Sequence, residues 1–306
     1  MKLVAVVVLL VPTLAFAEES SEVTFANVPT PDVESVSIDN PQGKLELSGW
    51  DKQEVRVVAH KHARDDKTLD QLTVEFVMLD GKVRIRTGVR VDNTFRPLPA
   101  SEGAGIDLTV TAPRGVNLRA KTWTGNLDVS GFRSGAVLSS QGGEVHAWDI
   151  EGEVHTNALR GKQRLTSIHG NVDADGGSGD VELDTIDGEV LEARVVDGQI
   201  VARKIRTPLV RLFSRAGGVL MMGSTRPGAR YEITALQGDV HLVLPRAPFT
   251  VDARARGGAI KNGFTLSHAV GSPTTLTGEF MGGGPQLELT AANGNVVLEP
   301  ASASLP

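Results

Sequence analysis

Residues 143–156 hold the pattern that decides the fold, reading Gly143-Glu144-Val145-His146-Ala147 and, nine residues later, Gly152-Glu153-Val154-His155-Thr156. The unit is glycine, polar, apolar, polar, and then an apolar or small residue. Glycine turns the backbone at a corner without a Cβ clash, and the alternation after it is typical of a short strand with one buried face. Clear copies start at Gly125, Gly143, Gly152, Gly170, Gly179, Gly188 and Gly198, later ones at Gly218, Gly238 and Gly294, and weaker ones at Gly135, Gly161 and Gly258.

The units are regularly spaced. They start every nine residues from Gly143 to Gly188 and every twenty residues from Gly198 to Gly258, with strand-like runs between the later ones. The nine-residue unit is therefore half of a longer coil. Five-residue strands cannot stand alone, whereas stacked coils pair every strand and bury a continuous apolar column. We predict an all-β fold, a parallel β-solenoid (β-helix-like) with about 18–20 residues per coil, and the alternative is a sandwich of short strands.

The repeat does not extend over the whole chain. We assign residues 18–115 to an N-terminal β region that caps or starts the solenoid, because terminal units of repeat proteins must hide an open edge. The solenoid occupies residues 116–299, with residues 285–298 as its final strands, and residues 300–306 form a tail. Within the N-terminal region residues 65–72 have a weak helical pattern, and the alternative is a connection between strands. We expect strands at 33–38, 43–47, 55–59, 72–78, 83–86 and 107–113.

The first 17 residues have the three parts of a signal peptide. Lys2 precedes an apolar run at residues 3–11, and Ala15-Phe16-Ala17 is a small-x-small cleavage site. The apolar run is shorter than the roughly 20 residues needed to span a bilayer. The chain has no cysteine, so neither disulfides nor a cysteine-linked lipid anchor can form. We therefore expect an exported protein, cleaved after Ala17, without a stable membrane span, in the periplasm or outside the cell. The alternative is a buried N-terminal strand or helix.

Composition narrows the class of partner. The formal net charge is −6, and the basic residues are scattered, whereas a nucleic-acid partner requires a basic stripe. Aromatic residues make up only 4% of the chain, and glycine is abundant at 34 residues. This combination favours short strands and tight turns over long helices.

Several segments resemble a known family. Leu108-Thr109-Val110-Thr111-Ala112-Pro113-Arg114-Gly115-Val116-Asn117-Leu118 resembles the strand-into-proline step that precedes the repeats of the bacterial putative-adhesin β-strand-repeat family, a domain of unknown function related to the head GIN domain putative adhesins. Thr122-Trp123-Thr124-Gly125-Asn126-Leu127-Asp128-Val129 and the following units resemble its body, and residues 236–245 resemble its late Gly-x-Val-x-Leu-x-Leu-Pro step. The resemblance covers nearly all of the chain after residue 17. It implies an exported β-solenoid with no established activity, and it supplies no catalytic residues.

Two groups of residues suggest metal ligands. Asp173-Ala174-Asp175-Gly176-Gly177-Ser178-Gly179-Asp180 is acidic, but it lacks the EF-hand glycine at position 6 and glutamate at position 12, so a solvated turn is favoured over a weak Ca²⁺ site. His146 and His155 occupy the same slot of adjacent units, which places them on different faces. His60 and His62 share a strand side without a third ligand nearby. We assign no metal and no cofactor.

Catalytic patterns are weak. There is no cysteine nucleophile and no G-x-S-x-G elbow. Asp128, Asp173 and Glu182 occupy outward slots, but any soluble solenoid carries charges there. We therefore assign no catalytic residues and predict that the protein is not an enzyme.

Glycan binding stays open. Trp50, Trp123 and Trp148 are candidate sugar-binding aromatics, with Trp148 expected to face outward, although all three can instead cover corners of the core. The predicted function is a non-catalytic binding protein or structural scaffold of the cell envelope. Its partner would be an envelope protein or a surface polysaccharide. The alternative is a carbohydrate-binding module or a polysaccharide-active β-helix enzyme. A groove that holds tryptophan or paired carboxylates would favour this alternative.

Overall fold

We describe the protein from a computed structural model, which describes residues 20–30, 32–98, 103–224 and 226–301. The chain forms two compact units, residues 1–152 (unit 1) and 153–306 (unit 2). The predicted signal peptide lies outside the described residues, as does the tail from residue 302 onward. The predicted boundaries at residues 17, 115 and 299 remain predictions.

Unit 1 consists of strands with one short helix. Its elements are β1 (Ser20–Pro29), β2 (Ser35–Gln42), β3 (Leu45–Trp50), β4 (Glu54–Ala63), α1 (Asp66–Gln71), β5 (Leu72–Leu79), β6 (Lys82–Val91), β7 (Thr94–Pro97), β8 (Ala104–Pro113), β9 (Asn117–Thr124), β10 (Leu127–Ser130), β11 (Ala136–Ser140) and β12 (Val145–Glu151). The strands expected before residue 115 and the helix at 65–72 are confirmed. Asp65 caps this helix, accepting a hydrogen bond from the Thr68 backbone N–H at 2.8 Å.

Two sheets form unit 1, with the strand orders β1-β4-β8-β3-β10-β12 and β11-β9-β2-β6-β5, and β7 pairs with β6. The early coil β2–β3 lies inside these sheets. Leu45 is in parallel register with Leu127 on one side and with Leu108 on the other. The segment Gly43–Leu47 is therefore a repeat unit in the geometry of its neighbours, although it lies in the region that we described as lacking the repeat.

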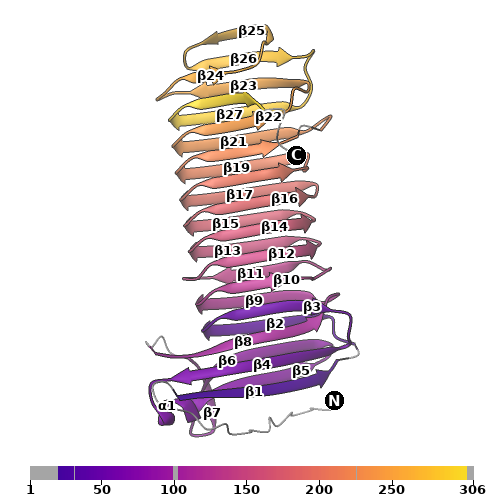
Figure 1. The fold of residues 1–306 in the computed structure, drawn as a ribbon, viewed down its shortest axis with the longest axis vertical. Helices are drawn as coiled ribbons and strands as arrows, with labels where there is room; N and C mark the ends of the chain where they lie inside the picture. Colours follow the sequence, from indigo (N-terminus) through magenta and orange to yellow (C-terminus); the bar gives the residue numbers. More distant parts are fainter. Residues whose placement is uncertain (1–19, 31, 99–102, 225, 302–306) are drawn as a thin grey trace. The chain divides into compact units, whose positions relative to one another are not determined.

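Unit 2 contains the strands of the later repeats (Figure 1). They are β13 (Val154–Arg160), β14 (Gln163–His169), β15 (Val172–Ser178), β16 (Val181–Asp187), β17 (Val190–Asp197), β18 (Ile200–Ile205), β19 (Leu209–Ala216), β20 (Val219–Gly223), β21 (Arg230–Gln237), β22 (Val240–Leu244), β23 (Phe249–Ala255), β24 (Ile260–Asn262), β25 (Ser267–Ser272), β26 (Thr275–Phe280), β27 (Gln286–Asn293) and β28 (Val296–Pro300). The two strand orders within the unit are β14-β16-β18-β20-β22-β28-β24 and β13-β15-β17-β19-β21-β27-β23-β26-β25.

Register confirms the coil length. Val154 pairs with Val172, and Val172 pairs with Leu191, which correspond to coils of 18 and 19 residues. One later coil is longer, because Leu209 pairs with Arg230 across a turn that contains Pro227. All of these pairings are parallel, so the predicted parallel β-solenoid is confirmed. Within the described residues, no helix is long and apolar enough to cross a membrane.

The apolar residues that alternate with polar ones in each repeat unit point into the interior, as the sequence pattern predicted. Val145, Val154, Val172 and Val181 are all buried, with at most 2% of any side chain exposed. Where the residue after the corner glycine is Asn or Asp, it can have a second role, as Asn126, Asn171, Asp180, Asp239 and Asn295 accept hydrogen bonds from the backbone of a neighbouring coil. Asn171 Oδ1, for example, accepts hydrogen bonds from the N–H groups of Glu189 and Val190, both at 3.0 Å. Stacked coils are thus joined at their corners as well as along their strands.

Corner glycines stack directly on one another. Gly198 has φ of +156°, and a Cβ added there would lie 2.3 Å from the carbonyl oxygen of Gly179. Gly217, one coil further on, would place a Cβ 2.0 Å from the carbonyl oxygen of Gly198. No side chain fits at such distances, so the glycine of the repeat is required by close backbone approach as well as by its conformation.

The order of coils in unit 2 differs from the order in sequence. We expected the coil at Gly258 to follow the coil at Gly238, with residues 285–298 as the final strands. Instead β27 lies between β21 and β23, where Leu287 pairs with both Tyr231 and Val251. Beyond it, the antiparallel strand β26 covers the other edge of β23, and the rings of Phe249, Phe264 and Phe280 cluster with centroids 5.0–5.3 Å apart. The edge of β23 is thus covered by β26, and β25, whose residues are all exposed, forms the outer edge of this sheet.

Candidate functional site

A pocket of about 440 Å³ on unit 1 contains two of the residues that were expected to face outward, Asp128 and Trp148. We call it the Trp148 pocket, and it is lined by Lys44, Glu46, Leu47, Ser48, Thr109, Asp128, Ser130 and Trp148. Strand register assembles it. Glu46 on β3 lies beside Thr109 on β8 and Asp128 on β10, and Ser130 lies beside Trp148 on β12. Because alternate side chains point to the same side of a sheet, these residues share one solvent-facing surface.

Trp148 is half-buried and faces outward, as its slot predicted. The His146 ring stacks on its indole with centroids 4.4 Å apart and an interplanar angle of 29°. The Nδ1 atom of His146 lies 3.7 Å from Asp128 Oδ1, which connects the aromatic pair to the carboxylate. An indole face beside hydrogen-bonding carboxylates and hydroxyls suits a ligand with an apolar face and a polar rim.

The Glu46 carboxylate of this pocket is held in the ionised form. A hydrogen bond from Lys44 lowers the pKa of Glu46, and the same contact raises the pKa of Lys44. Lys44 Nζ also lies 3.6 Å from Asp128 Oδ2, so one ammonium group holds both acids. A glycosidase needs a carboxylic acid whose pKa is raised, and the shift at Glu46 has the opposite sign. Glu46 is therefore unsuited to be a general acid.

The other two tryptophans lie outside this pocket. Trp50 donates from Nε1 to the Glu54 carbonyl oxygen at 2.9 Å, and Lys52 Nζ lies 4.7 Å above its ring centroid. Trp123 Nε1 is buried and makes no hydrogen bond within the described structure. Of the three candidate aromatics, only Trp148 lines a pocket with carboxylates.

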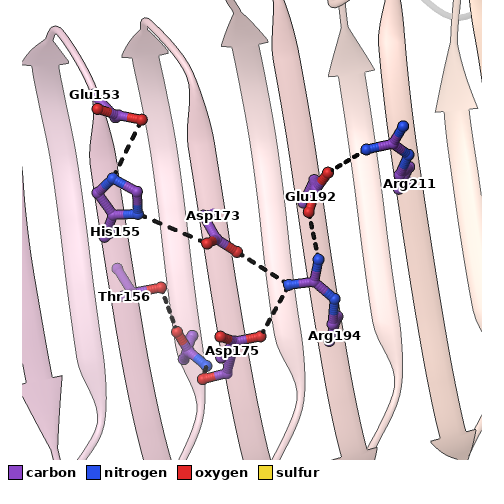
Figure 2. A network of polar contacts seen from close by, with 9 residues as sticks. Glu153, His155, Thr156, Asp173, Asp175, Glu192, Arg194 and Arg211 are labelled. Atoms are coloured by element: carbon purple, nitrogen blue, oxygen red, sulfur yellow. Dashed lines mark hydrogen bonds and ion pairs between the residues drawn. The ribbon is translucent and has the colours of Figure 1, made fainter.

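A second polar surface runs across the strands of unit 2 (Figure 2). We call it the ion-pair ladder, and its members are Glu153, His155, Asp173, Asp175, Glu192, Arg194 and Arg211. His155 lies 3.2 Å from Glu153 and 3.7 Å from Asp173. Arg211 lies 2.6 Å from Glu192, and Arg194 pairs with that same carboxylate. The contacts thus link side chains on the neighbouring strands β13, β15, β17 and β19.

Electrostatics of the ladder follow from these contacts. The hydrogen bond from Arg211, aided by the charge of Arg194, lowers the pKa of Glu192. That hydrogen bond also raises the pKa of Arg211. Glu192 and Arg211 are therefore held in their charged forms, as an ion pair on adjacent strands.

The segment considered for calcium contributes its carboxylates to the protein itself. Asp173 and Asp175 each have an oxygen 3.4 Å from Arg194 Nη1, and Asp180 Oδ1 accepts a hydrogen bond from the Gln199 backbone N–H at 2.9 Å. In the described part of the chain, no group of three or more His, Cys, Asp or Glu side chains is placed to hold a metal ion. Whether the segment binds Ca²⁺ weakly stays an open prediction.

The histidines flagged by sequence have protein partners. His146 stacks on Trp148 and His155 joins the ladder. His60 and His62 lie on β4, opposite Asp107 and Gly105 of β8. Glu182, the remaining outward carboxylate, lies 2.6 Å from Lys162 and 3.0 Å from Arg164.

One family model and several solved structures match the chain. The model of the Toastrack DUF4097 family matches residues 14–299. A "putative adhesin" of Bacteroides fragilis has 12% identity and a TM-score of 0.41, and the match covers 90% of this chain and 97% of that one. A "putative cell adhesion protein" of Clostridium sporogenes has 10% identity and a TM-score of 0.26, covering 93% and 100%. A "putative lipid binding protein" of Parabacteroides distasonis has 10% identity and a TM-score of 0.45, covering 90% and 96%. No curated protein matches the chain.

Proposed function

Because the chain belongs to the Toastrack DUF4097 family, we propose that it is an exported, non-catalytic binding protein or scaffold of the cell envelope. The observation that carries this proposal is the ion-pair ladder. Its charges stand on adjacent parallel strands, which are about 4.8 Å apart, and they are fixed by contacts with one another. A preformed charge array loses little conformational entropy on binding and so suits recognition of a repetitive, charged polymer or protein surface.

Export is the part of the proposal that rests on the N-terminal sequence. Lys2, the apolar run and Ala15-Phe16-Ala17 have the arrangement of a cleaved signal. The test is to express the full chain in a bacterial host, separate periplasm and medium from cytoplasm, and determine the N-terminal sequence. A mature chain that starts at Glu18 outside the cytoplasm is expected. Uncleaved protein confined to the cytoplasm would refute export.

The ladder is tested by binding to isolated envelopes of the producing cell in a sedimentation assay. We expect binding that weakens with salt, because screening acts on exposed charges beyond about 10 Å at 0.1 M. The double variant Arg194→Glu/Arg211→Glu should lower the bound fraction. Arg215→Glu/Arg256→Glu, which makes the same charge change at exposed positions outside the ladder, is the matched control. Equal binding by both double variants would refute a role for the ladder.

The Trp148 pocket favours a second function, carbohydrate binding. Trp148 supplies an aromatic face, and the side-chain oxygens of Glu46 and Asp128 supply acceptors for sugar hydroxyls. A glycan array with the wild-type chain, followed by calorimetry on the strongest ligand, tests this function. Trp148→Ala should weaken binding about tenfold or more, as loss of an aromatic contact typically costs at a binding site. Trp50→Ala, outside the pocket, should leave binding unchanged, and equal effects of the two would reject the pocket as a sugar site.

A further inference from the structure

The outer face of one sheet in unit 2 departs from the repeat. On β18, β20, β22 and β28 the outward slots, which are polar in most units, hold Val201, Leu220, Met222, Val243 and Val297, and all five are half-buried. Register places Val201 beside Leu220, and Met222 beside Val243. The result is an apolar stripe of Val201, Leu220, Met222 and Val243 across neighbouring strands. His241, which pairs with Glu299 at 3.1 Å, lies between Leu220 and Val297 in register. A contiguous apolar patch with a polar rim marks an interaction site.

The stripe leads into a pocket of about 370 Å³ at the ends of these strands, a volume in the range of small-molecule sites. Met222, Val243 and Pro245 provide its apolar lining. Ser224, also in the lining, belongs to a segment held in place by Tyr231, whose hydroxyl donates to the Ser224 carbonyl oxygen at 2.8 Å. The pocket therefore has a partly fixed wall.

Three cations line the same pocket, namely Arg203, Lys204 and Arg206. A register shift between Arg203 and Ile205 marks a bulge, and Lys204 inside it has φ of +53°. Bulges re-aim side chains, which explains how the adjacent residues Arg203 and Lys204 both reach the pocket that Arg206 also lines. The equivalent left-handed positions in the two preceding coils are Ser167 and Thr185, so the cation is particular to this coil.

The three cations differ from the arginines of the ladder. Within the described residues, no ion pair joins Arg203, Lys204 or Arg206 to a carboxylate. Asp184 stands beside Arg203 in register, but its Oδ1 accepts the Thr185 hydroxyl at 2.7 Å. Three cations next to an apolar lining, with Asp184 as a neighbour in register that makes no ion pair with them, form a site with excess positive charge. Such a site is complementary to an anion that has an apolar body.

We propose that this pocket binds a single-chain anionic amphiphile, with its carboxylate at Arg203, Lys204 and Arg206 and its acyl chain along Met222 and Val243 into the apolar stripe. An inorganic anion would use the cations but not the lining, and a neutral lipid would use the lining but not the cations. A bilayer would need a broad surface, whereas the cations gather at one pocket. This site is separate from both surfaces of the proposed function, and its binding can be measured without them.

Calorimetry with laurate, kept below its micellar concentration, tests the proposal. The probes acetate and glycerol monolaurate lack the chain and the charge, respectively, and each should bind about tenfold or more weakly than laurate. Equal affinity for acetate would show an anion site only. Equal affinity for monolaurate would show an apolar site only, and either result would overturn the proposal. The proposal would also be overturned if the protein bound vesicles that contain anionic lipid but did not bind laurate.

Variants assign the effect to the pocket. Arg203→Gln/Arg206→Gln should weaken laurate binding about tenfold or more, and Met222→Gln tests the lining independently. The control Arg215→Gln/Arg256→Gln makes the same charge change at exposed positions outside this pocket. All side chains chosen are exposed or half-buried, and circular dichroism checks that each variant is folded. Equal weakening by the pocket and control doubles, or laurate binding unchanged in all variants, would contradict the assignment.

Discussion

Gly198→Ala tests the central feature of the fold, the stacking of corner glycines. In the present structure the added Cβ would lie 2.3 Å from the carbonyl oxygen of Gly179 and 2.7 Å from its carbonyl carbon. Both are backbone atoms of the preceding coil, which is hydrogen-bonded on both sides. Neither the side chain nor its neighbour can rotate away, so the coils must separate locally or the corner must change conformation.

The magnitude has two parts. Holding alanine at φ of +156°, in a region that is essentially limited to glycine, costs about 1–3 kcal/mol. Forcing an extra carbon into a filled space costs about 1–3 kcal/mol more. We therefore expect the free energy of unfolding to fall by about 2–6 kcal/mol, which is large compared with the stability of a typical domain, about 5–15 kcal/mol.

Urea unfolding followed by far-ultraviolet circular dichroism measures this change. Gly228→Ala is the matched control, because Gly228 also has positive φ (+77°) but a Cβ there would meet nothing within 4 Å. It should cost only the backbone term, about 1–2 kcal/mol. The difference between the two variants isolates the overlap between coils. If Gly198→Ala cost no more than Gly228→Ala, the close approach of glycines would not be what fixes the repeat.

Three further variants probe local features. Thr185 is a β-branched residue at φ of +59°, so Thr185→Gly should raise the free energy of unfolding by up to about 1 kcal/mol through relief of strain. Thr166→Gly, at a position with ordinary φ, should lower the free energy of unfolding in the same urea assay. Asn40 is fully buried and binds the Ile106 carbonyl oxygen at 3.0 Å and the Thr87 hydroxyl at 2.6 Å, so Asn40→Ala should cost about 1–3 kcal/mol in thermal or urea unfolding. The pKa of Glu192 is lowered in the folded state, so its contribution to stability is complete above the unfolded pKa of about 4.3 and is lost as the pH falls through the lower folded value. Urea titrations between neutral pH and about pH 3 should therefore show a smaller loss of stability in Glu192→Gln than in the wild type, and identical pH profiles would contradict that role.

Much of the fold follows from local pattern. Alternation after each glycine identifies the inward side chains, and the nine-residue spacing gives the coil length, because both depend on neighbours within one or two coils. The order of coils at the C-terminal end did not follow, since residues 286–300 insert between coils that are consecutive in sequence. The units at Gly238, Gly258 and Gly294 have the same pattern, so the pattern cannot decide which of them stack on one another.

The candidate sites were only partly predictable, because local pattern shows which way a side chain points but not which distant strands lie beside it. The outward slot of Trp148 identified one wall of its pocket, but Glu46 comes from a strand far away in sequence that lies between β8 and β10. The segment Gly43–Leu47 carried the signal, as a copy of the unit within the N-terminal region. For the amphiphile pocket the signal was Val219-Leu220-Met221-Met222, where four apolar residues in succession break the alternation near Arg203-Lys204-Ile205-Arg206.

The interior position of β27 and β28 has a consequence for how unit 2 is made. The ribosome synthesises β23 to β26 before β27 and β28. In the folded unit, however, β27 lies between β21 and β23, and β28 lies between β22 and β24. Until those strands arrive, the exposed ladder of β21 can pair with β23 directly, and this provisional pairing must then open. We therefore expect the last stage of folding to be a slow exchange of strand partners, rather than the addition of one more coil to a growing end.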